Sequence, residues 1–189
     1  MLKGRAHWLA QFVAAALALA GVGLVAAGAW IPAKALFARH LLITAFEQGL
    51  ALGAAQKPWP SADFSVIGTL TIKHATVAVL DRATGQALAF GAGRHEEIEA
   101  GAMVLSGHRD THFAPLHKVE KGDTVSFNGL MGERRFSVIE VRIVDTRAET
   151  IMVPGPRQLM LLTCWPFDAI NPDTPWRFLV LADEKGRSA

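Results

Sequence analysis

The first strong pattern along the chain is a long stretch without charged side chains near the N-terminus. Residues 8–31 are apolar or small apart from Gln11. As a helix this stretch would be about 36 Å long, which exceeds the roughly 30 Å hydrocarbon thickness of a membrane. It predicts a transmembrane helix, with a cleaved signal peptide as the alternative because Ala27-Gly28-Ala29 fits a cleavage site. Both interpretations export the rest of the chain.

A second apolar pattern, with helical spacing, follows the first. Between residues 33 and 56 apolar side chains such as Leu36, Phe37 and Leu41 recur on one side of a predicted helix. We interpret it as a juxtamembrane helix that packs on a folded domain, rather than as a helix that binds a partner. Pro58 and Pro60 then predict a short stiff connector. The expected boundaries are 1–32 for the anchor, 33–60 for the juxtamembrane helix and connector, and 61–189 for the folded domain.

The remaining sequence has the short runs that are typical of β-strands. β-Branched and aromatic residues concentrate at residues 64–73, 76–80, 102–106, 124–127, 135–144, 159–163 and 176–181. In the run 135–144, Phe136 and Val138 share one face whereas Val141 and Ile143 share the other, which predicts a bulge or a bend. Only residues 111–119 have a helical pattern. The sequence therefore predicts an all-β domain, either a closed barrel or a sandwich.

Charge changes this picture only at the N-terminal end. The net charge is +2, but residues 1–59 hold five basic side chains against the single acid Glu47. The folded domain is therefore slightly acidic. A nucleic-acid-binding protein places its basic excess on the folded domain, where it neutralises phosphates, so this class of function is disfavoured. Basic residues flank both ends of the apolar stretch, so the positive-inside rule does not set its orientation.

The single cysteine lies where a predicted strand ends. Cys164 follows the apolar run 159–163 and precedes Trp165-Pro166. His108 follows another apolar run in the same way, within Ser106-Gly107-His108. A histidine at one strand end and a cysteine at another can provide a nucleophile and a proton-transfer partner. A buried, inert thiol is the alternative from the residues alone.

Several motifs together resemble those of the sortases, the membrane-anchored cysteine transpeptidases of bacterial surfaces. They are Gly107-His108-Arg109-Asp110, Leu161-Leu162-Thr163-Cys164, and Arg177 thirteen residues after the cysteine. Leu116 followed by Gly122-Asp123, and Cys-Trp-Pro-Phe at 164–167, are similar to further sortase motifs. The long anchor, compact domain and Arg-Asp pair after the histidine look most like the proteobacterial sortases. One departure is Met160, which stands where the family motif begins with threonine.

The resemblance implies a reaction. Cys164 would attack the Thr–Gly bond of an LPxTG-like sorting signal, and an amine acceptor would resolve the thioacyl-enzyme. His108 would act as general acid and then as base, and Arg177 would bind the peptide and stabilise the oxyanion. The expected substrate-binding residues are Thr163, Trp165 and Trp176. Core packing is the alternative for the two tryptophans.

The resemblance also implies a fold and a location. The fold is an all-β, eight-stranded sortase-like barrel with short helices, preceded by the transmembrane and juxtamembrane helices, and residues 61–189 form its catalytic domain. The chain would cross the inner membrane once and place this domain in the periplasm. Its partners would be a protein with a C-terminal LPxTG-like signal, an amine acceptor and the membrane. Neither a metal nor an organic cofactor is needed.

Metal binding is the first alternative that the residues leave open. His108, His112 and His117 lie close in sequence and would suit zinc, although positions beside the groove or in solvent are favoured. Glu96, Glu97 and Glu99 would suit calcium, although a solvated loop is favoured.

Two other functions also remain open, a hydrolytic Cys–His peptidase and a non-catalytic, membrane-tethered β-domain. An L,D-transpeptidase would carry Ser-x-Gly-Cys at the nucleophile, and Leu-Leu-Thr-Cys does not fit. Asp110 is expected either to orient Arg109 or His108 or to cap the helix at 111–119. Arg109 is expected to face outward and to matter less than His108.

Overall fold

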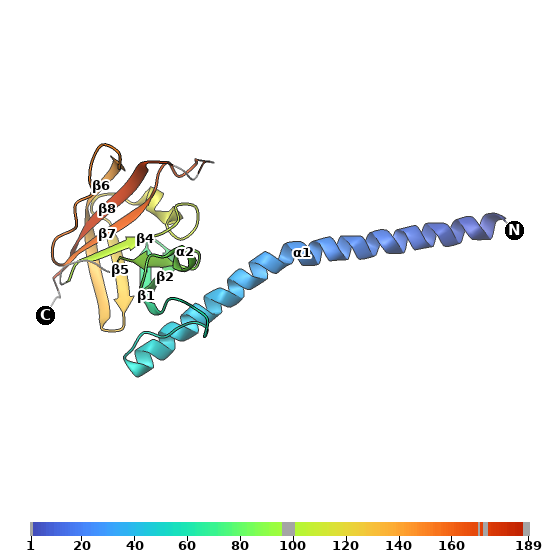
Figure 1. Cartoon of the computed structure of the whole chain (residues 1–189), viewed down its shortest axis with the longest axis horizontal. Coiled ribbons are helices and arrows are strands. Elements are labelled where there is room, and N and C mark those ends of the chain that lie inside the picture. Colours follow the sequence, from blue (N-terminus) through green and yellow to red (C-terminus); the bar gives the residue numbers. More distant parts are fainter. Residues whose placement is uncertain (1, 96–100, 170, 172–173, 187–189) are drawn as a thin grey trace. The chain divides into compact units, whose positions relative to one another are not determined.

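The computed structural model describes residues 2–95, 101–169, 171 and 174–186, and it divides the chain into two compact units, Met1–His40 and Leu41–Ala189. The elements, labelled in Figure 1, are α1 (Leu2–Leu52), β1 (Val66–Ile72), β2 (Ala75–Leu80), α2 (Gly85–Leu88), β3 (Ala92–Arg94), β4 (Met103–Ser106), the 3₁₀ helix η1 (Ala114–Lys118), β5 (Thr124–Gly129), β6 (Gly132–Asp145), β7 (Gln158–Cys164) and β8 (Trp176–Glu184).

A single helix, α1, occupies the region where the sequence predicts two. It includes Pro32, at which the sequence analysis ends the first helix. Proline removes one backbone hydrogen bond and favours a kink, but a long helix can continue past it. The large apolar side chains between Phe12 and Ile31 are exposed. The segment Gln11–Leu52 is long and apolar enough to cross a membrane, judged by length and composition.

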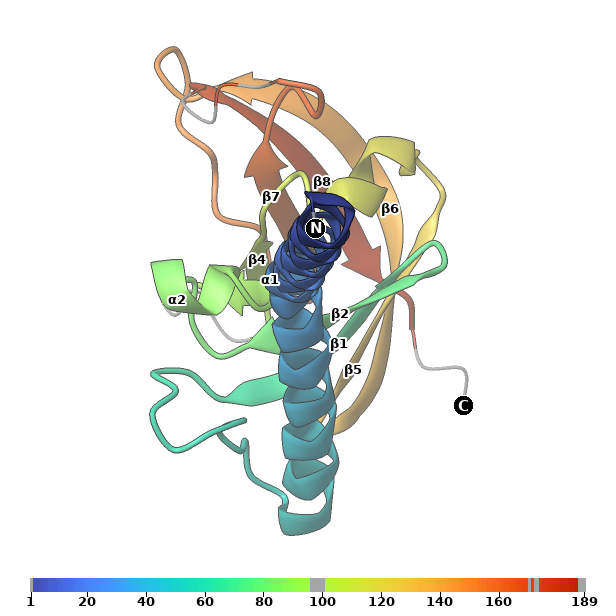
Figure 2. The ribbon, with the colours of Figure 1, turned by 90° about the vertical axis from the view of Figure 1, so that its right-hand side faces the viewer.

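Within the described residues, the second unit is a closed β-barrel of eight strands. Their order around the barrel is β1-β2-β3-β4-β7-β8-β6-β5. Most neighbouring strands are antiparallel, but β2 with β3 and β4 with β7 are parallel. Figure 2 shows β4, β7 and β8 following one another along one side of the barrel. The closed, all-β barrel of eight strands is the predicted fold, and the sandwich alternative is wrong.

The strands form where apolar side chains alternate with more exposed ones. In β1 the side chains of Leu70 and Ile72 are fully buried, and the residues between and beside them are partly exposed. Inward-facing side chains of the other strands, such as Leu161 and Val180, complete this main core inside the barrel. Because alternate residues of each strand face outward, the same strands can also carry a site on the outer surface.

Two local predictions can be compared directly with the structure. The bulge in β6 is confirmed, because the pairing of β6 with β8 shifts register between Val138 and Glu140. The helix expected at residues 111–119 is reduced to η1, with Phe113 at its N-cap position and no side-chain cap bond. Asp110 therefore does not cap this helix. The capping role, one of the two expected for Asp110, is wrong.

The last turns of α1 belong to the barrel unit. Leu42, Ala45 and Phe46 are buried, and they share a second core with side chains of β1 and β2 and of the connector. Trp59 of the connector packs edge-on against Phe64, with 5.6 Å between ring centroids. The predicted packing of this segment on the folded domain is thus confirmed for these residues. The functional boundaries expected at 32 and 60 stay predictions.

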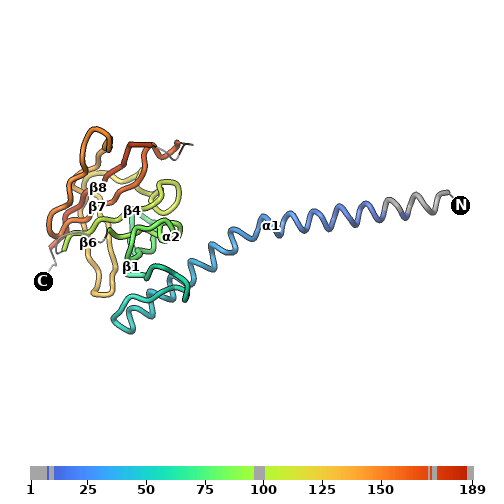
Figure 3. The backbone as a smooth tube through the Cα atoms, viewed as in Figure 1, coloured from blue at the N-terminus to red at the C-terminus, as the bar shows by residue number. Residues whose placement is uncertain are grey.

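The two ends of the barrel carry different connections. The β6–β7 and β7–β8 connections leave one end, and the β5–β6 hairpin lies at the other, as the backbone trace shows (Figure 3). β8 begins at the first end and finishes at the second, since Trp176 pairs with Asp145 and Glu184 pairs with Phe136. The predicted site residues all lie near the first end.

Candidate active site

The three predicted catalytic residues lie side by side at the ends of three neighbouring strands. β4 and β7 are parallel, and residues 103–106 pair in register with residues 159–162. The same register, continued by two residues, brings His108 abreast of Cys164. β8 runs antiparallel to β7, and Cys164 pairs directly with Arg177. The order across the sheet is therefore His108, Cys164, Arg177, with the cysteine in the middle.

Cys164 and Arg177 lie on the outer face of the barrel. Along β7, Leu161 points into the main core, whereas Leu162 packs against a separate cluster. Cys164 is two residues beyond Leu162 and so lies on the outer face as well. Directly paired residues of antiparallel strands share a face, which places Arg177 beside the cysteine. The thiol is free and half-buried, so it is accessible to a peptide on this surface.

Thr163 points the opposite way, toward the interior. Its side chain is only 3% exposed, and its hydroxyl donates a hydrogen bond to the carbonyl of Gly107 at 2.7 Å. The backbone N–H of Gly107 in turn donates to the carbonyl of Leu162 at 3.3 Å. These two bonds fasten the residue before His108 to the residues before Cys164. The hydroxyl is thus used within the protein, and its expected contact with substrate stays a prediction.

The guanidinium of Arg177 is held by backbone carbonyls. Its Nη1 donates hydrogen bonds to the carbonyl oxygens of Thr174, at 2.5 Å, and Trp176, at 3.0 Å. Both acceptors are neutral, and Arg177 forms no ion pair with any carboxylate in the described part of the chain. The guanidinium is therefore oriented but not neutralised. Such a group can stabilise negative charge that develops on a bound carbonyl oxygen.

Arg109 is buried, so the expectation that it faces outward is wrong. Its side chain is 8% exposed. Nη2 donates hydrogen bonds to the carbonyl oxygens of Ala169, at 2.7 Å, and Asn171, at 2.9 Å. The guanidinium therefore reaches from the loop that carries His108 to the loop that joins β7 and β8. Sequence reasoning missed this contact because nothing in a Gly-His-Arg-Asp loop indicates which carbonyls lie across from it.

His112 and His117 lie near His108 in different environments. The ring of His112 donates from Nε2 to the carbonyl of Ala89 at 3.3 Å. Burial lowers the pKa of His112 because it disfavours the charged ring, and repulsion from His108 acts in the same direction. The ring of His117 packs against Phe167, with centroids 5.8 Å apart. The surroundings of His112 thus favour its neutral ring.

The described residues do not gather a metal site. Among them, no three side chains of His, Cys, Asp or Glu lie together in a way that could hold a metal ion. The zinc alternative at the three histidines therefore gains no support. The calcium alternative at Glu96, Glu97 and Glu99 lies outside the described residues.

Trp165 and Trp176 extend the strand pairing beyond the candidate site. The backbone N–H of Trp165 donates to the carbonyl of Trp176 at 3.1 Å, one step past the paired Cys164 and Arg177. Trp176 is 38% exposed and Trp165 is half-buried. Neither is fully enclosed in the main core, and their expected contact with substrate stays a prediction.

A second apolar cluster lies on the outer side of the strand that carries Cys164. Its members Val104, Val144, Met160 and Leu179 are buried, and Ile151 and Leu162 pack against them. Ile151 belongs to the β6–β7 connection, whose next residues, Met152 and Val153, are 75% and 63% exposed. The connection therefore covers the cluster and leaves only its own apolar side chains accessible. Sequence reasoning missed this cover because residues 146–157 carry no strand or helix pattern.

A polar pair lies near His108 on the neighbouring strand and was also missed. His95, just after β3, and Ser106 of β4 are hydrogen-bonded, with Nε2 and Oγ 2.7 Å apart. Ser106 pairs with Leu162 and therefore lies on the outer face of β4. It comes two residues before His108. Ser106 stands within a motif that the sequence analysis quotes. Its partner His95 directly follows β3, and only the pairing of β3 with β4 brings the two side chains together.

Comparison with known proteins gives three findings. A family model described as the sortase domain matches residues 70–185. Sortase D of Bacillus subtilis is 29% identical over an alignment of 113 residues, and the alignment covers 57% of this chain and 57% of that protein. The chain thus matches just over half the length of this relative.

Solved structures agree with this at the level of the fold. Sortase A from Corynebacterium diphtheriae aligns with a TM-score of 0.57 at 23% identity, over 66% of this chain and 63% of that one. Sortase C1 from Streptococcus suis aligns with a TM-score of 0.56 at 24% identity, over 66% of this chain and 75% of that one. At such identities the likeness shows the barrel fold alone.

Proposed function

Because the chain belongs to the sortase family, we propose that it is a cysteine transpeptidase that cleaves an LPxTG-like sorting signal and transfers the acyl part to an amine acceptor. The observation that carries this proposal is the row formed by β4, β7 and β8. The parallel register of β4 with β7, continued by two residues, would bring His108 abreast of Cys164, and Arg177 pairs with Cys164 from the other side. A nucleophile between a proton-transfer group and a fixed positive charge suits acyl transfer.

In the first step the sulfur of Cys164 attacks the carbonyl carbon of the threonine in the sorting signal. The carbon–sulfur bond forms, the peptide carbon–nitrogen bond breaks, and His108 gives a proton to the leaving amine. In the second step the acceptor amine attacks the thioester, His108 takes a proton from it, and the thiolate of Cys164 leaves. The products are a new amide and the released C-terminal fragment, so the reaction balances without a cofactor.

Arg177 acts on the oxyanion in both steps. Each tetrahedral intermediate carries negative charge on the former carbonyl oxygen, and a fixed donor near that oxygen lowers the barrier. The carbonyls of Thr174 and Trp176 hold the guanidinium in place before substrate arrives. The planar guanidinium is better suited to this than an ammonium, because it offers several donors in one rigid plane.

Thr163 and the β6–β7 connection support the reaction in different ways. We assign Thr163 to positioning, because its hydroxyl holds Gly107 and therefore the spacing between His108 and Cys164. The exposed apolar side chains of the connection, Met152 and Val153, are suited to the leucine and proline of an LPxTG-like signal.

The test is a transpeptidation assay with the full-length protein in detergent. It is incubated with a small library of sorting-signal peptides and an oligoglycine amine or hydroxylamine, and the products are identified by mass spectrometry. We expect an acyl product that carries the amine and a total peptide turnover that rises with amine concentration. Rising turnover would mean that resolution of the thioacyl-enzyme limits the hydrolytic reaction.

Substitutions assign this activity to the site. Cys164→Ala and His108→Ala are expected to abolish turnover while the melting temperature stays close to that of the wild type. His74→Ala is the matched control, since His74 is an exposed histidine in the turn between β1 and β2. Purely hydrolytic products at tens of millimolar amine would favour the peptidase alternative. A Cys164 that thiol reagents do not modify in the folded protein would favour the non-catalytic β-domain.

We propose that the chain is anchored in the inner membrane by residues 8–31, with the barrel in the periplasm. The exposed apolar side chains of α1 and its length support this. An alkaline phosphatase fusion after Asp183 should be active in vivo, because that enzyme works only outside the cytoplasm. An inactive fusion would contradict the proposed topology, and a mature protein that begins at Trp30 would indicate a cleaved signal. Membership of the proteobacterial branch stays a prediction.

A further inference from the structure

Arg109 is the buried side chain that joins the two loops of the candidate site. One loop follows β4 and carries His108, and the other joins β7 to β8 and connects Cys164 with Arg177. The 8% exposed guanidinium donates hydrogen bonds to two carbonyls of the second loop, those of Ala169 and Asn171. A single side chain thereby links the candidate acid–base residue to the segment between the nucleophile and its arginine.

The backbone around His108 is fixed on either side of this residue. Gly107, before it, is held by the hydroxyl of Thr163. The carbonyl of His108 itself accepts hydrogen bonds from the N–H groups of Phe113, at 2.9 Å, and Thr111, at 3.4 Å. The position of the histidine loop therefore depends on its bonds to its surroundings, and Arg109 supplies the bonds that reach the β7–β8 loop.

The β7–β8 loop also packs on its surroundings through an aromatic side chain. Phe167 packs against Phe178 of β8 and against His117 of η1, with ring centroids 5.1 and 5.8 Å apart. These apolar contacts place the loop against the barrel end but are not strongly directional. Hydrogen bonds from a charged donor to two carbonyls specify both distance and orientation.

We propose that Arg109 is a positioning residue that fastens the β7–β8 loop to the histidine loop and so keeps His108 abreast of Cys164. This role rests on the proposed transpeptidase function. Arg109 acts through His108 and the loop and makes no contact with the reacting atoms. Its partners are neutral carbonyls, so the contact is a matter of geometry and not of charge neutralisation.

The donor geometry makes arginine specific at this position. A guanidinium can serve two carbonyls from one planar head, whereas the ammonium of lysine is a compact charge on a flexible stem. Nη1 of Arg109 is also buried and has no hydrogen-bond partner within the described residues. The guanidinium therefore has a donor to spare for one further acceptor at this junction.

The experiment compares Arg109→Lys and Arg109→Ala with Arg134→Ala in the full-length protein. Arg134 is the matched control because it is also a partly buried arginine that bonds a backbone carbonyl, that of Gly101 at 3.0 Å, but it lies toward the far end of the barrel. Three quantities are measured: hydrogen exchange of residues 165–171, the rate of Cys164 alkylation by iodoacetamide at pH 7, and kcat and KM for a sorting peptide.

We expect both Arg109 variants to speed hydrogen exchange in residues 165–171 and to leave the barrel strands unchanged. The rate of Cys164 alkylation at pH 7 should fall, because the histidine no longer lies beside the thiol. kcat should fall by about 10-fold to 100-fold while KM changes by less than about threefold, since misplaced catalytic groups slow chemistry more than binding. Arg134→Ala should change none of these quantities.

Two outcomes would overturn the proposal. Unchanged exchange in residues 165–171 would show that Arg109 does not hold the loop, and this readout does not depend on enzymatic activity. Wild-type kcat in Arg109→Lys, together with an unchanged alkylation rate, would show that two carbonyl bonds are not required. If the wild-type protein itself has no Cys164-dependent activity, the proposed function fails, and hydrogen exchange still decides whether Arg109 fastens the loop.

Discussion

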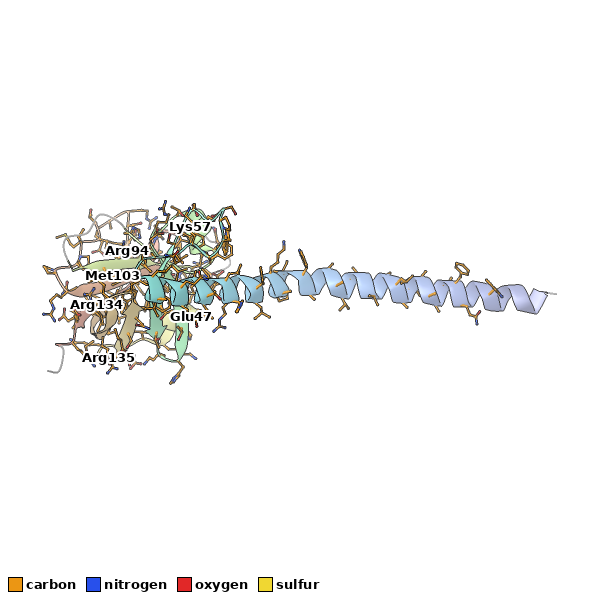
Figure 4. The ribbon with its side chains drawn as sticks, turned by 90° about the horizontal axis from the view of Figure 1, so that it is seen from below. Glu47, Lys57, Arg94, Met103, Arg134 and Arg135 are labelled. Carbon is orange, nitrogen blue, oxygen red and sulfur yellow. The ribbon has the colours of Figure 1, made fainter. Side chains whose placement is uncertain are left out.

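Two pairs of arginines at opposite ends of the barrel have different partners. Where β8 finishes, Arg134 donates two hydrogen bonds to the carboxylate of Glu184, at 3.1 and 3.0 Å, and Arg135 pairs with Glu133. Where β8 begins, Arg147 also pairs with a carboxylate, that of Asp145, but Arg109 and Arg177 donate to backbone carbonyls. Figure 4 labels Arg134 and Arg135, whose side chains lie close together on one side of the barrel unit.

This difference distinguishes cations that are neutralised from cations that remain available. A carboxylate partner cancels the charge of a guanidinium, and the lowered pKa of Glu184, caused first by its bonds to Arg134, reflects that pairing. A carbonyl partner orients a guanidinium without cancelling its charge. The type of acceptor therefore separates arginines whose charge is cancelled from arginines, such as Arg177, whose charge remains available to a substrate.

The largest expected effect is at Arg177. Arg177→Lys should lower the rate of transpeptidation by about 10²–10³, because the ammonium cannot keep both carbonyl bonds and also meet the oxyanion. Arg134→Lys is the matched change at the opposite end and should stay within about threefold of the wild type. Peptide turnover by mass spectrometry measures both. Activity of Arg177→Lys within threefold of wild type would mean that Arg177 only orders its strand.

The next largest effect is expected at Thr163, which lies at the same end of the barrel as Arg177 and makes a neutral hydrogen bond. Thr163→Val keeps the shape of the side chain but leaves the carbonyl of Gly107 without its donor. We expect the free energy of unfolding to fall by about 1–3 kcal/mol, measured by urea denaturation. Transpeptidation should fall as well, because His108 loses its spacing from Cys164.

Two controls accompany this change. Thr163→Ser retains the hydroxyl and should restore most of the transpeptidation rate. Thr71→Val removes a hydroxyl that faces Thr76 on the surface, at 3.4 Å, and should cost less than about 0.5 kcal/mol. An equal loss in Thr71→Val and Thr163→Val would show that the Gly107 contact has no special role.

A smaller effect is expected where the charges are paired. Glu184→Gln should lower the free energy of unfolding by about 1 kcal/mol and leave transpeptidation unchanged. Because the folded pKa of Glu184 is lowered, its contribution is present above the ordinary glutamate value near 4.5 and is lost as the pH falls through the folded pKa. Thermal unfolding from pH 7 to pH 3 should therefore bring the variant and the wild type together. A loss of activity in Glu184→Gln would contradict the division between the two ends.

The smallest effect concerns His112, beside His108. Its folded pKa is lowered by burial, so below pH 6.5 the unfolded chain binds more protons than the folded one. This group therefore makes the protein less stable as the pH falls from about 7 toward its folded pKa. His112→Asn removes that titration, and the difference in melting temperature between pH 7.5 and pH 5.5 should shrink. An unchanged difference would place the pH dependence elsewhere.

The fold could be predicted to the extent that local pattern specifies it. Alternation along β1 and the phase change near Val138 are properties of neighbouring residues, and both appear in the structure. β3 and α2 were not predicted, because elements of three and four residues carry too little periodicity. The continuation of α1 through Pro32 was also not predicted, since a proline is compatible with either a bend or an end.

The candidate site divides in the same way. His108, Cys164 and Arg177 were singled out because each belongs to a recognisable motif, and the strand registers bring them together. The burial of Arg109 and the pairing of His95 with Ser106 depend on which loops meet across the barrel end. Such contacts between distant segments leave no trace in spacing or composition. A single sequence therefore predicts the candidate catalytic residues more readily than it predicts the residues that position them.

The parallel pairing of β4 with β7 determines when a newly made chain can acquire its site. His108 and Cys164 are 56 residues apart in sequence, as the register of these strands requires, and Arg177 follows later still. Contacts of this range form only after a long loop has closed, so they arise late and slowly in folding. Arg177 reaches the cysteine across the short β7–β8 connection, whereas His108 reaches it only when the longer loop closes. Pairing of β4 with β7 is therefore the step that completes the site.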